Sequence, residues 1–183
     1  MIWNCLEGIY AVSDAVIRNN IILNSTLGLS LYPHAQVPVL KNITAVNNTL
    51  FGNATGVRVR WGGSNMVLAN NAVYSPGGNA IDSGGGIGAT AIVRNNYIEG
   101  TSTSAIDNAR FFNGGSSSTV FTNAAARNFW PLSNSILLGK ADAKLPESES
   151  KKRVCVTDAK SAMRWFKQHA GELGIDPDRI ITG

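Results

Sequence analysis

Charged residues are scarce in this 183-residue chain, where they make up 15% of the sequence, against about 25% in a typical globular protein. The scarcity is uneven. Residues 1–140 hold 8 Lys or Arg and 5 Asp or Glu, whereas the much shorter range 141–183 holds 8 and 7. A single fold rarely combines two such compositions. We therefore predict one domain over 1–145, a linker over 146–150 and a separate segment over 151–183.

Other absences narrow the class of protein. No apolar run approaches the roughly 20 residues of a membrane helix, and Met1–Glu7 lacks the basic start and apolar core of a signal peptide. Cys5 and Cys155 are too few for a disulfide framework or a metal-ligand spacing. The net charge is only +4, and Lys151–Arg153 is the largest basic cluster. We expect no membrane or nucleic-acid partner and no metal ligands.

What the chain does contain is an internal repeat of about 25 residues. Apolar residues recur four and two positions before a pair of asparagines and three positions after its first member. Such alternation is the period of a β-strand with one buried face. The pairs are Asn19-Asn20, Asn47-Asn48, Asn70-Asn71 and Asn95-Asn96.

A second apolar strand follows each pair by about ten residues, and the segments between strands are rich in Gly, Ser, Asn and Thr. A repeat this short cannot bury its own apolar face, so the repeats must stack. By strand parity the first asparagine of each pair points inward, where stacked amides can hydrogen-bond to one another. We predict such a structural ladder from Asn19, Asn47, Asn70 and Asn95.

The phrase Val16–Ile22 (Val-Ile-Arg-Asn-Asn-Ile-Ile) and its repeats resemble right-handed parallel β-helix proteins of the pectate-lyase-like superfamily. The resemblance covers about residues 5–145, and Phe121–Lys140 looks like the closing coil of such proteins. It implies an all-β fold, a right-handed parallel β-helix of about five rungs, followed by a C-terminal α-helical segment. With no capping helix before Met1, the chain is expected to be the C-terminal part of a longer β-helix.

The same resemblance directs attention to outward-facing charged residues, because enzymes of the superfamily place their catalytic groups there. Asp82 and Asp107 hold matched positions in adjacent repeats and are the candidate catalytic pair, with calcium as a cofactor if the activity is that of a lyase. Two alternating arginines, Arg58 and Arg60, share one strand face beside Trp61, so this trio is the candidate sugar-binding group. The alternative is that all five are ordinary surface or turn residues.

The charged C-terminal segment follows another pattern. A helical period over Asp158–Ala170, followed by Leu173–Ile180, resembles the helix–turn–strand unit that precedes the nucleophile of α/β-hydrolases of the acetyl-esterase and lipase type. The chain ends at Gly183, before the Gly-x-Ser-x-Gly phrase that the resemblance would require. We therefore expect no esterase activity from residues 151–183.

These observations favour a polysaccharide-binding or polysaccharide-processing β-helix joined to the start of an esterase-like domain. Its expected partner is a polysaccharide or oligosaccharide, and the parent protein is expected to be extracellular or periplasmic, although this chain carries no signal peptide. The parent would be a carbohydrate esterase or a polysaccharide lyase, with this fragment inactive. Two alternatives stay open: a β-helix lyase or glycoside hydrolase that uses outward carboxylates, and a truncated or misassembled reading frame without a function of its own.

Overall fold

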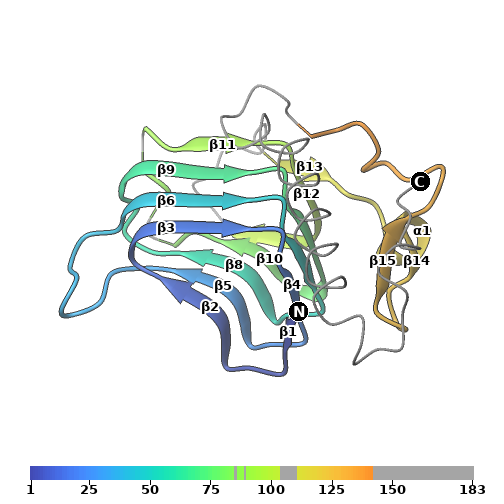
Figure 1. The fold of residues 1–183 in the computed structure, drawn as a ribbon, viewed down its shortest axis with the longest axis horizontal. Coiled ribbons are helices and arrows are strands. Elements are labelled where there is room, and N and C mark those ends of the chain that lie inside the picture. The colour runs from blue at the N-terminus through green and yellow to red at the C-terminus, as the bar shows by residue number, and fades with distance from the viewer. Residues whose placement is uncertain (85, 89, 104–110, 142–183) are drawn as a thin grey trace, which may run out of the picture. The chain divides into compact units, whose positions relative to one another are not determined.

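The computed structural model describes residues 1–84, 86–88, 90–103 and 111–141, which form mainly short parallel strands (Figure 1). The elements of these residues are β1 Ile2–Trp3, β2 Glu7–Ala11, β3 Ser13–Arg18, β4 Ile21–Leu23, β5 Leu27–Leu31, β6 Lys41–Val46, β7 Thr49–Phe51, β8 Thr55–Val59, β9 Ser64–Ala69, β10 Ala72–Asp82, β11 Ile92–Arg94, β12 Asn96–Thr103, β13 Phe111–Asn113, α1 Ser117–Val120, β14 Phe121–Asn123 and β15 Asn128–Pro131.

The strands stack into three parallel sheets. The first contains β1, β4, β7 and the start of β10, and the second contains β2, β5, β8 and the end of β10. The third contains β3, β6, β9 and β11. Because β10 and β12 each pass from the first sheet into the second, these two sheets are continuous there. The chain thus winds through one strand of each sheet per turn, which confirms the predicted parallel β-helix.

The core lies inside these turns and comes from the repeated apolar positions. In the first sheet, Ile22 is in register with Leu50, and Leu50 with Val73; all three are completely buried. The two apolar positions before each asparagine pair likewise face the interior, as Ile43 and Leu68 illustrate. The strand periodicity read from the sequence therefore identified the buried face correctly.

The asparagine ladder exists, but the second member of each pair forms it. Asn48 is 1% exposed, and its Nδ2 donates to Oδ1 of Asn71 at 3.0 Å. Asn71 in turn donates to Oδ1 of Asn96 at 2.9 Å, and Asn20 donates to Oδ1 of Asn48 at 3.1 Å. These amides also cap carbonyl groups of the neighbouring turn, as Asn48 does for Ile17 at 2.9 Å.

The prediction for Asn19, Asn47, Asn70 and Asn95 is therefore wrong, and the backbone explains why. All four have a positive φ between 50° and 56°, the left-handed conformation that asparagine tolerates better than most residues. A left-handed residue bends the chain at the end of the third sheet, so the strand alternation stops there. The first asparagine makes the corner, and the second turns inward.

The C-terminal described residues do not close the β-helix as another coil. Phe121–Asn123 and Asn128–Pro131 pair as the antiparallel hairpin β14–β15. This hairpin packs on residues of the first sheet: the ring of Phe129 lies 5.4 Å from that of Phe51, and Phe121 lies 5.0 Å from Tyr74. Tyr74 is completely buried and donates its hydroxyl to the carbonyl of Gly114 at 2.8 Å. The expectation of a closing coil over Phe121–Lys140 is corrected accordingly.

The described residues make about four turns, where the sequence predicted about five. The difference arises because the supposed closing coil is the antiparallel hairpin. Several predictions lie outside the described residues: Asp107, the domain boundary near 145, the linker 146–150 and the hydrolase-like segment 151–183. In the part of the chain that is described, no helix has the length and apolar character needed to cross a membrane.

Candidate functional site

A column of polar and aromatic side chains follows the second sheet. Tyr10 is in register with Ser30, Ser30 with Arg58, and Arg58 with Asp82. These positions alternate with core residues such as Leu29 and therefore point outward. Residues that are distant in sequence are thus placed about one strand spacing apart, roughly 4.8 Å.

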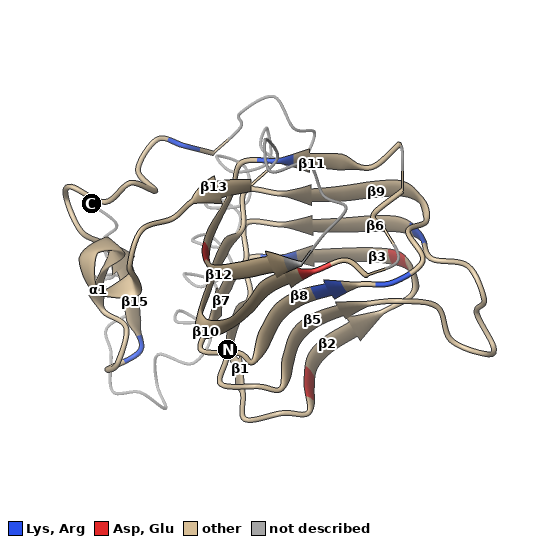
Figure 2. Cartoon of the chain, turned by 180° about the vertical axis from the view of Figure 1, so that it is seen from behind, with Lys and Arg blue, Asp and Glu red and all other residues tan. Residues whose placement is uncertain are grey.

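Two arginines converge on one carboxylate within this column. Nη1 and Nη2 of Arg60 lie 2.7 Å from the two carboxylate oxygens of Asp82, and Nε of Arg58 lies 3.2 Å from Oδ2. The Asp82 side chain is 11% exposed, whereas Arg58 and Arg60 are 32% and 28% exposed. The hydrogen bonds from Arg60 to Asp82 raise the pKa of the guanidinium above its ordinary value. Figure 2 shows basic positions at β8 next to an acidic position of the neighbouring strand.

This arrangement changes the role assigned to Asp82. The sequence placed Arg58 and Arg60 on one face, and in the structure both contact Asp82. Asp82 joins them, and both of its oxygens accept hydrogen bonds from guanidinium groups. Asp107, the predicted partner of Asp82, lies outside the described residues. The group carries a formal charge of +1 and offers further N–H donors to solvent.

Trp61 stands at the edge of this charged group in an unusual conformation. Its side chain is 67% exposed and its φ is 49°, a left-handed value that bulky residues rarely adopt. The turn is fixed by its neighbours: Gly62 donates its N–H to Gly86 O at 3.1 Å, and a Cβ on Gly63 would collide with the carbonyl of Leu40. A strained backbone that holds a large aromatic ring in solvent is an indication of function.

Two tyrosines extend the group toward the first turn. The rings of Tyr10 and Tyr32 are 4.6 Å apart, and the Tyr10 hydroxyl donates to the Tyr32 carbonyl at 3.1 Å. The Tyr32 hydroxyl donates to Oε1 of Glu7 at 2.7 Å, and this bond to a carboxylate raises the pKa of Tyr32 to about 12. His34 lies edge-on to Tyr10 at 6.5 Å. Sequence reasoning missed the two tyrosines, although Tyr10 lies in β2 and Tyr32 directly follows β5.

The Glu7–Tyr32 contact predicts a titration. Glu7→Gln is expected to lower the pKa of Tyr32 toward the ordinary value of about 10, because the amide carries no negative charge. Since folding raises this pKa, the contact stabilises the fold below about pH 10, and that contribution is lost as the pH rises through about 12. Tyrosinate absorbance of wild type, Glu7→Gln and Tyr32→Phe would measure the change. An unchanged titration in Glu7→Gln would contradict the contact.

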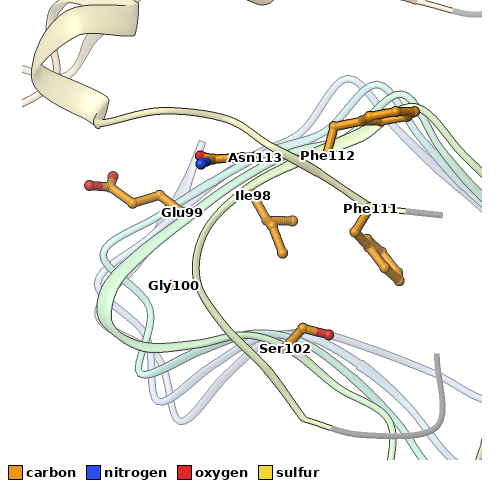
Figure 3. Close-up of a pocket in the computed structure, with 7 residues that line it drawn as sticks. All are labelled: Ile98, Glu99, Gly100, Ser102, Phe111, Phe112 and Asn113. Carbon is orange, nitrogen blue, oxygen red and sulfur yellow. The ribbon is translucent and has the colours of Figure 1, made fainter. Parts of the chain in front are cut away.

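A hollow near the last described turn has a different character. It is lined by Ile98, Glu99, Gly100, Ser102, Phe111, Phe112 and Asn113. Figure 3 shows Ile98 and Phe111 pointing into the space, with Glu99 and Phe112 directed away from it. Phe111 belongs to the hydrophobic core and Ile98 packs against it, so this hollow is the end of the core rather than a polar binding site.

The described residues were also compared with the requirements of a metal site. Among the described residues, no three His, Cys, Asp or Glu side chains gather closely enough to hold a metal ion. Calcium, expected only for a lyase, stays a prediction that depends on residues such as Asp107. What the described face provides is guanidinium donors and aromatic surface.

Comparison with known protein families supports the β-helix fold. Residues 1–73 match the family model described as the right-handed beta helix region. This part of the chain is a right-handed β-helix. The matched range of the β-helix includes Arg58, Arg60 and Trp61, whereas Asp82 lies beyond it. No match was found among curated proteins or among solved structures.

Proposed function

We propose that the β-helix binds a polysaccharide through the outward face that carries Arg58, Arg60 and Trp61. The apolar face of a sugar ring would stack on the indole of Trp61, and the partly exposed guanidinium groups would donate hydrogen bonds to its hydroxyl or carboxylate oxygens. A face built from stacked rungs suits a polymer, because neighbouring sugar units can contact successive turns.

The observation that carries the proposal is the exposure of Trp61 in a left-handed backbone. An exposed indole contributes little to folding, and its backbone conformation costs of order 1–3 kcal/mol. The two glycines that follow it, Gly62 and Gly63, nevertheless fix the turn that places it next to Arg60 in the chain. Ligand binding is a physical reason for keeping a large side chain where glycine would be more stable.

Polysaccharide cleavage by a lyase or glycoside hydrolase is the alternative, and it would need a free carboxylate. Asp82 offers none, because Arg58 and Arg60 occupy both of its oxygens. We therefore favour binding over cleavage for this face. An extracellular or periplasmic parent protein, where polysaccharides are encountered, belongs to the same proposal.

Trp61→Gly tests the proposed site. Glycine accepts the left-handed φ, so the variant should remain folded with a free energy of unfolding equal to or above that of wild type. Its affinity for polysaccharide should fall about tenfold or more, equivalent to about 1.4 kcal/mol or more of lost stacking. Affinity electrophoresis in gels containing polygalacturonate or neutral galactan would measure binding, with chemical denaturation as the measure of folding.

Trp61→Phe is the matched control, because it keeps an aromatic ring at the same backbone position. It should retain most of the affinity that Trp61→Gly loses. A folded Trp61→Gly variant that migrates like wild type in both gels would refute the proposed site. Retarded migration in only one gel would identify the charge of the preferred polymer.

A further inference from the structure

A second groove lies between the first sheet and the hairpin β14–β15. It has a volume of about 610 Å³, within the range of small-molecule sites. None of the residues described above for the Trp61 face contributes to it. Its lining residues are Ile21, Thr49, Arg127, Asn128, Phe129 and Trp130.

The apolar wall of this groove is held in place by packing. Phe129 lies 5.4 Å from both Phe51 and Phe121, which belong to the small core beneath the hairpin. Trp130 follows Phe129 on β15 and leaves 78% of its surface exposed. The groove thus combines an anchored aromatic residue with an adjacent indole that is open to solvent.

The polar groups of the groove are mostly donors. Arg127 has its guanidinium carbon 5.2 Å from the ring centre of Trp3, and within the described ranges no carboxylate pairs with it. Asn128 uses its Oδ1 to accept from the backbone N–H of Trp130 at 3.2 Å, which leaves its amide nitrogen as a donor. Thr49 adds a hydroxyl, and no acidic side chain is among the lining residues.

We propose that this groove is a second binding site, for a saccharide unit that carries a carboxylate. The exposed indole of Trp130 provides a stacking surface for a sugar ring, and the guanidinium of Arg127 provides the charged partner for the carboxylate. The excess of donors matches a ligand that is rich in acceptors. The inference is independent of the Trp61 face, because the two sites share no residue.

The experiment removes the first site and then tests the second. In the Trp61→Gly background, binding of trigalacturonate and of neutral galactotriose would be measured by titration calorimetry on the full chain. Trigalacturonate should still bind, and adding Trp130→Ala should weaken that binding about tenfold or more. Adding Arg127→Gln should weaken trigalacturonate binding about fivefold and leave galactotriose unchanged.

The outcomes separate the two proposals. Loss of all trigalacturonate binding in Trp61→Gly would overturn the second site and support the first. Full affinity in Trp61→Gly with loss in Trp130→Ala would support the second site and overturn the first. Equal effects of Arg127→Gln on both trisaccharides would overturn the assigned carboxylate contact.

Circular dichroism would confirm that each variant keeps the β-structure. A folded Trp130→Ala variant with unchanged affinity would overturn the groove as a site.

Discussion

Replacing Asn48 by alanine is expected to destabilise the β-helix by about 4 kcal/mol, because several buried polar groups lose their partners at once and each costs roughly 1–3 kcal/mol. The Asn20 backbone N–H and side-chain amide would lose the acceptor Oδ1 of Asn48. The Ile17 carbonyl would lose its side-chain donor, and Oδ1 of Asn71 would keep the backbone N–H of residue 48 but lose the side-chain donor. Urea unfolding followed by circular dichroism would measure the loss.

The adjacent residue provides a matched control. Asn47→Gly keeps a residue that accepts the left-handed φ of 56° and leaves the ladder intact, so it should change the free energy of unfolding by less than about 1 kcal/mol. If Asn47→Gly proved as damaging as Asn48→Ala, the assignment of the ladder to the second asparagine would be wrong.

The second large effect is expected at Gly56 in β8. A Cβ on this residue would collide with the Val73 side chain and lie 2.6 Å from the Ala80 carbonyl oxygen of the next turn. Both neighbours are completely buried and part of the stacked core, so neither can move freely. Gly56→Ala should cost about 3 kcal/mol through overpacking and distortion of the strand ladder.

Gly77→Ala separates this steric cost from that of losing a glycine. Gly77 has a φ of 75°, and a Cβ there would meet nothing within 4 Å. Its replacement should therefore cost only about 1 kcal/mol of backbone strain. Thermal unfolding of the two variants should place Gly56→Ala well below Gly77→Ala, and the reverse order would contradict the packing at Gly56.

The repeat made the fold accessible from sequence, because strand alternation and the asparagine pairs report on the same stacked turns. The alternation of inward and outward positions gave the wrong ladder residue, and it did so where the chain turns a corner at the end of a strand. Counting inward and outward positions through Asn47 assumes extended backbone, and its left-handed φ breaks that assumption. The hairpin β14–β15 was also missed, because its aromatic residues fit a further rung as well as they fit a lateral cover on Tyr74.

Only part of the candidate site could be predicted from the sequence. The sequence placed Arg58 and Arg60 on one face and matched Asp82 with Asp107, whereas the strand register sets Asp82 opposite Arg58. The bidentate contact from Arg60 required knowledge of the turn that follows β8. The Tyr32–Glu7 hydrogen bond could not be predicted, since it joins the first residue of β2 to the residue that follows β5 in the next turn.

The asparagine ladder also has a direction. Asn20, Asn48 and Asn71 each donate to the asparagine of the following turn, so Oδ1 of Asn48, Asn71 and Asn96 accepts from the preceding turn. Insertion of one whole turn between two ladder positions would keep each donor opposite an acceptor. Insertion of half a turn would interrupt the column. The β-helix can therefore be lengthened or shortened by whole turns without interrupting the asparagine ladder.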